Sequence, residues 1–211
     1  MLSKTKTKLI SIASQAIVAD PPALGGRLSA SFNGALRELI ELLSIRNGFF
    51  AFESALHVFP SSASAPLSLE NWNRNELWRL EYPNIPADAV FFAEDIFGGQ
   101  FAIQSNAVTY MEPETGRFKR VASSFEEFVR RLLTDFRTLT GHRFAHDRQS
   151  ANGPLGYGQR LAGKIPFVLG GAYDLENFYA ARQPDLMRMR GHIAKQIAHL
   201  PEGAKVKLKT T

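Results

Sequence analysis

The sequence predicts an α+β fold in which a mixed or antiparallel sheet of about four to six strands is flanked by helices. Residues 90–121 alternate between short apolar runs and turn signals, which is typical of antiparallel strands joined by tight turns. On either side of this stretch, apolar residues recur with the spacing of a helix face. Hydrophobic residues make up 45% and charged residues 21% of the 211-residue chain, the balance of an ordinary globular protein.

The helix before the sheet is predicted from one apolar stripe with i, i+3, i+4 spacing. Its members are Phe32, Ala35, Leu36, Leu39, Ile40 and Leu43. Asn47–Gly48 is expected to end it, because glycine adopts the left-handed conformation without a Cβ penalty. Residues 49–59 then indicate strand or extended chain, and residues 69–82 a short helix. The apolar residues expected to be buried there are Trp72, Leu77, Trp78 and Leu80.

A meander of three or four antiparallel strands is predicted next. Its turns are expected at Gly98–Gly99, at Ser105–Asn106 and at residues 112–116, all of which favour tight turns. The strands that these turns separate are expected at residues 90–93, 100–104, 107–111 and 117–121.

A second long helix is predicted over residues 124–139. Ser123 and Ser124 each precede a glutamate by three residues, which is the capping-box spacing, and Gly141 is expected to end the helix. Its apolar face consists of Phe125, Phe128, Val129, Leu132, Leu133 and Phe136.

Residues 31–141 are predicted to form the main domain, with further segments before and after it. Residues 1–30 are an N-terminal extension, and residues 142–163, polar and glycine-rich, are expected to be a linker. Residues 164–211 are too few for a large core and should form a small α/β extension docked on the main domain. Its expected elements are a strand-like run at 166–171, a short helix around 175–181, a helix from Pro184 or Asp185, and a final short strand at Val206 and Leu208.

The net charge of +5 lies mostly at the chain ends. Residues 1–20 and 201–211 each hold three lysines against one acidic residue, a net of +2 each, which leaves +1 between them. A nucleic-acid binder usually has a basic face within its folded part, so nucleic acid is a disfavoured partner. No apolar run approaches the roughly 18 residues of a membrane-spanning helix. The lack of cysteine excludes disulfides, thiolate nucleophiles and Cys-ligated metal sites.

The N-terminal segment is not interpreted as an export signal. Its apolar stretch is interrupted by Ser11, Ser14 and Gln15, and residues 17–19 do not form a small-x-small cleavage site. The expected location is therefore the cytoplasm, and the segment itself is expected to be a helix or strand.

No catalytic, cofactor-binding or metal-binding residues are predicted. His142 and His146 have the i, i+4 spacing of metal ligands and lie near Asp147, but they follow the helix end at Gly141 and are interpreted as solvated loop histidines. The other histidines are attributed to a partly buried structural position or to a polar helix face: His57, His192 and His199.

Three further groups of residues are candidate sites. Glu94 and Asp95 form a carboxylate pair just before a turn, and turn organisation is favoured over acid–base catalysis because no convergent partner is visible. Gly170–Gly171 lacks a phosphate-loop pattern and gives only a weak anion-site signal. The candidates for partner binding are Trp72, Arg74 and Trp78, although core packing is favoured for the two tryptophans.

Several motifs follow one another in order over residues 32–139. They are Asn47–Gly48–Phe49–Phe50, a segment through Trp78, residues 91–103 around Gly98–Gly99, residues 112–116, and Ser124–Phe125 with Phe128. This order resembles the SUKH superfamily, also called the SMI1/KNR4 family, in which a helix closed by Asn-Gly, a glycine-bearing hairpin and a Ser-Phe-x-x-Phe helix recur. Residues 166–177 are similar to the C-terminal extension of GAD-like or DUF1851-type bacterial immunity proteins.

The resemblance implies an α+β fold and a non-enzymatic role. Many bacterial members are immunity proteins that bind and neutralise a cognate toxin of a polymorphic or contact-dependent system. The matching residues are structural in character, so the resemblance assigns no binding site. Two alternatives stay open: a small hydrolase or transferase that uses His57 or the Glu94–Asp95 turn, and a weakly basic nucleic-acid-binding protein.

Overall fold

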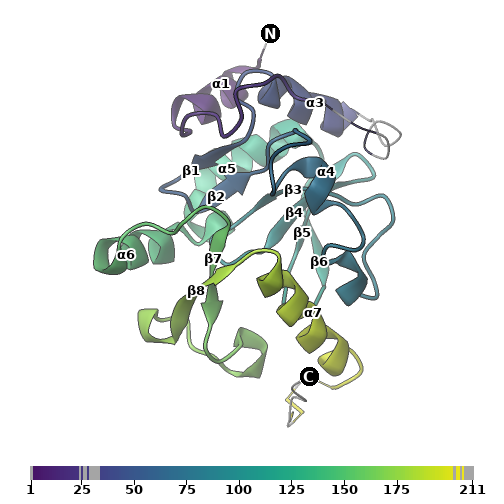
Figure 1. The fold of residues 1–211 in the computed structure, drawn as a ribbon, viewed down its shortest axis with the longest axis vertical. Helices are drawn as coiled ribbons and strands as arrows, with labels where there is room; N and C mark the ends of the chain where they lie inside the picture. The colour runs from purple at the N-terminus through teal and green to yellow at the C-terminus, as the bar shows by residue number, and fades with distance from the viewer. Residues whose placement is uncertain are drawn as a thin grey trace.

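The structure of the chain, a computed structural model, describes residues 2–23, 25, 28, 34–201, 203, 204 and 206. Within them a six-stranded sheet has helices on both faces, and a two-stranded sheet lies to one side of it (Figure 1). The predicted α+β class is confirmed, with every strand pair antiparallel. Among the described residues, no helix has both the length and the apolar character needed to span a bilayer.

The six-stranded sheet is a meander, in which each strand pairs with the next along the chain. Its strands are β1 (Phe49–Ala51), β2 (Leu56–Val58), β3 (Val90–Glu94), β4 (Gln100–Gln104), β5 (Ala107–Met111) and β6 (Phe118–Ala122). The four strands predicted between residues 90 and 121 are therefore confirmed. The stretch predicted as strand or extended chain at 49–59 forms the first two, with a turn between them.

The helices are α1 (Lys4–Ser11), α3 (Gly34–Leu43), α4 (Leu69–Trp72), α5 (Phe125–Thr140), α6 (His142–Asn152) and α7 (Asp185–Ile197). The predicted helices at 124–139 and from Asp185 are confirmed, and α5 ends at Gly141 as expected. The helix predicted before the sheet is α3, although Phe32 lies outside the described residues.

Strand β3 shows how the core is built on both faces of the sheet. The ring of Phe92 lies 5.6 Å from that of Phe125 and 5.5 Å from that of Phe128, both in α5. Its neighbour Phe91 points to the opposite face, where its ring lies 5.0 Å from Trp78. All five residues of β3 are buried, because both faces of the sheet are covered.

The N-terminal extension is part of this packed structure. Helices α1 and α3 lie beside α5, at the top of Figure 1. The ammonium of Lys6 is 2.6 Å from Glu38 of α3 and 3.5 Å from Glu126 of α5, so one cation joins all three helices. Residues 14–18 then run along the outer edge of β1.

The C-terminal part departs from the sequence prediction in several places. The predicted linker 142–163 contains α6 and strand β7 (Gln159–Gly163), and the predicted helix at 175–181 is a 3₁₀ turn, η3 (Leu175–Asn177), followed by strand β8 (Phe178–Arg182). Pairing of β8 with β7 overrides the helix propensity of the segment. The run 166–171 contains the 3₁₀ turn η2 (Phe167–Leu169) instead of a strand.

Three smaller expectations are also revised. Leu80, in the 3₁₀ turn η1 (Arg79–Glu81), is 66% exposed instead of buried. The segment predicted as one helix at 69–82 is only helical at α4 and η1. Val206 is not in a strand, and Leu208 lies outside the described residues.

Gly141 and Gly153 at the two ends of α6 allow a matched test of this packing. Both have positive φ, +67° and +77°, but a Cβ on Gly141 would lie 2.7 Å from atoms of Ile96 and Phe97, whereas nothing lies within 4 Å of one on Gly153. We expect Gly153→Ala to lose about 1–2 kcal/mol of unfolding free energy through backbone strain. Gly141→Ala should lose about 1–3 kcal/mol more through the clash. Urea unfolding of both variants measures the difference, and equal losses would contradict the packing described.

Candidate functional site

One buried carboxylate, that of Glu94 at the end of β3, is contacted from four other segments. Its Oε1 lies 3.1 Å from Nδ1 of His57 on β2 and 2.9 Å from Nε of Arg160 on β7. Its Oε2 accepts hydrogen bonds from Nε2 of Gln183, just before α7, at 2.8 Å and from Nε2 of Gln100 on β4 at 3.3 Å. All five residues are buried, and we call them the Glu94 cluster.

These contacts keep Glu94 ionised and His57 neutral. Burial by itself raises the pKa of the Glu94 carboxyl, but the charge of Arg160 and the hydrogen bonds from His57 and Gln183 outweigh it, so that the pKa is lowered. The pKa of His57 is also lowered, chiefly by its burial. Because an ionised carboxylate can only accept, Nδ1 of the neutral imidazole must be the nitrogen that donates to it.

The other ring nitrogen of His57 has no polar partner. Its Nε2 is buried and meets no hydrogen-bonding group among the described residues. Aromatic rings surround it instead, with Phe50 stacked at 4.5 Å and the rings of Phe59 and Tyr157 at 4.9 Å and 5.8 Å. A histidine hydrogen-bonded to a carboxylate is the pattern of a general base, but His57 and Glu94 are both 0% exposed. In this conformation no substrate reaches them.

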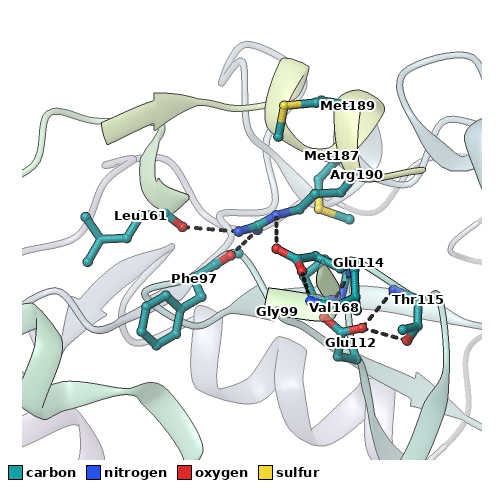
Figure 2. Close-up of polar contacts among 12 residues, drawn as sticks. Phe97, Gly99, Glu112, Glu114, Thr115, Leu161, Val168, Met187, Met189 and Arg190 are labelled. Atoms are coloured by element: carbon teal, nitrogen blue, oxygen red, sulfur yellow. Dashed lines mark hydrogen bonds and ion pairs between the residues drawn. The ribbon is translucent and has the colours of Figure 1, made fainter. Parts of the chain in front are cut away.

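A second buried arginine, Arg190 on α7, lies among three oxygen groups (Figure 2). It donates to the carbonyl oxygens of Phe97, after β3, and of Leu161, on β7, the latter at 3.3 Å. Its Nε lies 3.8 Å from Oε1 of Glu114, in the turn between β5 and β6, and Oε2 of Glu114 accepts from the backbone N–H of Val168 at 2.9 Å. Burial raises the pKa of Glu114, although the N–H of Val168 and the Arg190 charge oppose this.

Asp95 organises the turn between β3 and β4, which confirms the turn role favoured from the sequence. Its Oδ1 accepts from the backbone N–H groups of Phe97 and Gly99, both at 2.8 Å, and its Oδ2 accepts from the hydroxyl of Tyr110 on β5 at 2.9 Å. Burial raises the pKa of Asp95 to about 6, against the opposing effect of these hydrogen bonds.

The two arginines tie residues 159–197 to the ends of the sheet strands. Arg160 reaches Glu94 from β7, and Arg190 reaches the turn after β3 from α7. Sequence reasoning missed both arginines, together with Gln183 and Glu114, because the groups that they contact in the main sheet or across it lie more than 50 positions away along the chain. For Arg190 a signal existed, since it falls on the buried face of α7 with Leu186, Met187, Ile193 and Ala194.

The paired histidines of α6 contact a single carboxylate. Nε2 of His142 lies 3.3 Å from Oε1 of Glu53, and Nδ1 of His146 lies 2.8 Å from Oε2. Glu53 is in the turn between β1 and β2, where Phe52, Glu53 and Ser54 all have positive φ. The hydrogen bond between His146 and Glu53 raises the pKa of His146 and lowers that of Glu53.

These histidines are therefore helix residues that hold α6 against the β1–β2 turn, which corrects their interpretation as loop residues. Asp147 instead lies 3.8 Å from Arg143 within α6. Over the described ranges, no group of three or more His, Cys, Asp or Glu side chains has the arrangement of a metal site.

The two tryptophans named as partner-binding candidates are core residues. Trp72 and Trp78 are 0% and 1% exposed, their indole N–H groups donate to Gln100 and to the carbonyl oxygen of Trp72, and their rings lie 5.5 Å apart. The core packing favoured from the sequence is thus confirmed for both, and the alternative of a partner-binding role is wrong for them, because neither ring reaches the surface. Arg74 is exposed and stays a candidate.

Two weaker sequence candidates gain no site from the structure. Gly171 follows η2 instead of a strand, and a Cβ there would lie 1.9 Å from the carbonyl oxygen of Ile165, so an oxygen already occupies the space. His192 is half-buried on α7 and His199 is exposed beyond its end.

Exposed apolar side chains gather in the C-terminal part of the chain. Among the described residues, eleven large hydrophobic side chains are exposed, and seven of them lie between positions 157 and 189. The seven are Tyr157, Ile165, Val168, Tyr173, Leu175, Tyr179 and Met189, which we call the C-terminal apolar set. Tyr173, 58% exposed, stacks on Phe167 with ring centroids 3.9 Å apart, so its position is fixed by packing.

An open groove of about 750 Å³ borders this region. It runs between the β5–β6 turn, η2 and the end of α7. Its apolar lining includes Val168, Leu169, Ile197 and Leu200, and Thr115 and Arg117 are polar residues on its wall.

The chain matches no known family model and no curated protein. A solved structure, that of Atu4351 from Agrobacterium tumefaciens, is similar in fold with a TM-score of 0.55 at 11% sequence identity. The likeness covers 90% of this chain and 88% of that one, so it includes the C-terminal part as well as the sheet. At this identity it concerns the fold alone.

The Glu94 cluster predicts strong coupling between its two charges. Arg160→Met leaves a buried carboxylate without its cation, and we expect a loss of about 3–5 kcal/mol of unfolding free energy. The double variant Glu94→Gln/Arg160→Met should lose less than the sum of the single variants, because it removes both charges. Arg131→Met, which removes an exposed helix pair with Glu127, is the control and should change stability little. Additive losses in the urea unfolding cycle would contradict the coupling.

Asp95 predicts a pH-dependent difference between wild type and Asp95→Asn. The pKa of Asp95 is raised from 3.8 to about 6 in the folded state, so its contribution favours folding below pH 4 and is lost as the pH rises to about 6. The stability of Asp95→Asn relative to wild type should therefore increase between pH 4 and 6, by at most about 3 kcal/mol, and level off above pH 7. Unfolding curves at four pH values measure this, and a constant difference would refute the assignment.

Proposed function

We propose that this protein is a non-enzymatic binding protein whose C-terminal part docks on another protein, and that this partner is a cognate toxin which it neutralises by contact. The observation that carries the binding role is the C-terminal apolar set. The toxin as partner, and a cytoplasmic site of action, are supported by the resemblance of the sequence to SUKH-type and GAD-like immunity proteins.

The recurrence of exposed apolar side chains within one stretch of the chain supports an interface there. Single exposed hydrophobic side chains are common on any protein, whereas neighbouring ones mark an interaction surface. Tyr179 and Met189 are such neighbours, with the Tyr179 hydroxyl 4.0 Å from the Met189 sulfur. The same stretch also exposes side chains of both signs of charge, with Lys164 and Arg182 on one hand and Asp174 and Glu176 on the other. Apolar and charged side chains occur together in protein–protein interfaces, and this stretch of the chain exposes both.

The buried contacts of Arg160 and Arg190 restrict the motion of the C-terminal part before a partner binds. Arg160 and Arg190 fix β7 and α7 against the sheet. Two members of the C-terminal apolar set depend on these elements, Met189 on α7 and Tyr179 on β8, the strand paired with β7, so their backbones have little freedom to lose when a partner binds. In a surface that is less rigid, loops and side chains must become ordered when a partner binds, and this loss of entropy weakens the affinity. The structure thus favours tight binding without a disorder-to-order step.

A second candidate function is a small hydrolase or transferase. The observation in its favour is the 3.1 Å contact between His57 and Glu94, which has the chemistry of a general base. Its access depends on opening of the Glu94 cluster, since both side chains are 0% exposed. The protein-binding role needs no such opening and is preferred for that reason.

Copurification of the tagged protein from its native cells tests the proposed function. We expect one polypeptide in equal amount, identified by mass spectrometry, and inhibition of its toxicity by the purified protein. The double variant Ile165→Ser/Tyr173→Ser should bind this polypeptide at least about tenfold more weakly, because each change removes an exposed apolar contact.

The matched control is Ile45→Ser, since Ile45 is 62% exposed but lies outside the C-terminal apolar set. It should leave the affinity unchanged. Equal weakening by the control, or recovery of no partner with the protein folded, would count against the proposal.

A further inference from the structure

The outer edges of the strands differ in how they are protected. A free strand edge presents unpaired N–H and C=O groups, and proteins normally cover it or place charges or bulges there. The edge of β1 is covered, because the N–H of Ser14 donates to the carbonyl oxygen of Phe50 at 2.7 Å and the N–H of Ile17 to that of Gly48 at 2.9 Å. Residues 14–18 thus act as its neighbour.

Two other edges are protected in different ways. Strand β6 ends the sheet with exposed Lys119 and Arg120 and with an irregular register beside them, both of which discourage pairing. The outer edge of β7 is occupied by the main domain. Its Leu161 N–H donates to the carbonyl oxygen of Ile96 at 2.8 Å, and the Leu161 carbonyl oxygen accepts from Arg190.

Strand β8 has neither kind of protection. Its register with β7 pairs Leu161 with Ala180. The flanking bonds, Lys164 N–H to Asn177 and Gln183 N–H to Gly158, show that odd-numbered residues of this strand face β7. Ala180 and Arg182 therefore direct their N–H and C=O groups outward. None of the described residues bonds to these groups, and the strand contains no proline and no register shift.

The side chains around this edge suit a polypeptide ligand. Tyr179 and Met189 are 39% and 41% exposed, and the Tyr179 hydroxyl lies 4.0 Å from the Met189 sulfur. Together they form a small exposed apolar surface next to β8. Arg182, at the far end of the edge, is exposed and has no ion pair with any residue that the structure describes. In a bound strand, an apolar side chain would pack against Tyr179 and Met189, and a carboxylate would pair with Arg182.

We infer that β8 accepts an extended segment of a partner protein as an added β-strand, with an apolar side chain beside Tyr179 and an acidic one at Arg182. Only an extended peptide backbone presents donors and acceptors at the spacing of the outward groups of β8. The inference rests on the proposed function in that the partner is taken to be the same protein, but it is tested separately.

The test uses a phage-displayed library of linear twelve-residue peptides, selected on the wild-type protein. The variant is Ala180→Pro, which removes an outward N–H while leaving the bonds to β7 in place, because proline is tolerated at such positions of edge strands. The control is Ala180→Ser, which keeps the N–H. Selected peptides should bind wild type and Ala180→Ser alike and Ala180→Pro at least about tenfold more weakly.

Amide hydrogen exchange on the wild-type protein gives a readout that does not depend on the variant folding. The amides of Ala180 and Arg182 should exchange fast in the free protein and slowly with peptide bound, whereas the amide of Ala181, which faces β7, should be slow in both.

Three results would overturn the inference. They are enrichment of no linear peptide, equal binding to the proline and serine variants, and protection of the outward amides in the free protein by a second copy of the chain. Peptide binding at β8 without a copurifying cellular partner would instead refute the proposed function and leave the inference intact.

Discussion

The ion pair between Glu94 and Arg160 sets the position of the C-terminal part of the molecule. Both side chains are buried, and their charged groups lie 2.9 Å apart. A shift of β7 relative to β3 would leave a buried charge without its counter-ion, at a cost of about 3–5 kcal/mol. His57 and Gln100, which lie in the same sheet as Glu94, orient its carboxylate. Gln183 then gives the C-terminal part a second contact with that carboxylate, beside the one from Arg160.

The same constraint explains how a short hairpin can present an interaction surface. Two strands alone are marginally stable in water. Arg160 of β7 pairs with Glu94, and Arg190 of α7 donates to the carbonyl oxygen of Leu161 on β7, so both arginines hold the β7–β8 pair in place. An aromatic cluster adds to this, in which the ring of Phe97 lies 5.3–5.6 Å from those of Phe144, Phe167 and Phe178. The outer edge of the pair therefore stays extended without a partner, and the exposed side chains beside it keep their positions.

Local patterns in the sequence were sufficient for the four strands at residues 90–122 and for the helices α3 and α5. The meander and α5 have strong signals, because their apolar residues follow periods of two and 3.6 and their turns and caps are formed by neighbours in the chain. The Glu94 cluster is different, since Glu94 and Arg160 lie 66 positions apart and nothing in the surroundings of either residue indicates a buried charge. The burial of Arg190 could have been predicted in part, because a charged residue on the apolar face of a helix implies a buried group of opposite charge or a hydrogen-bond acceptor. For Trp72 and Trp78 the sequence favoured core packing over an exposed binding role, and their burial confirms that preference.

The region where sequence reasoning failed most is also the region with the open edge. Residues 175–181 are predicted as a short helix, and their leucine, glutamate and two alanines favour one, yet they form η3 and most of β8. Local preference and tertiary structure usually agree, and natural proteins depart from that agreement mainly at functional sites. The two alanines at the centre of β8 contribute little strand propensity, and its outward N–H and C=O groups contribute no hydrogen bonds among the described residues. Because side chains stand above and below a sheet and the pairing groups point along its plane, the outer edge of β8 stays open to another backbone, which is the property that an added strand requires.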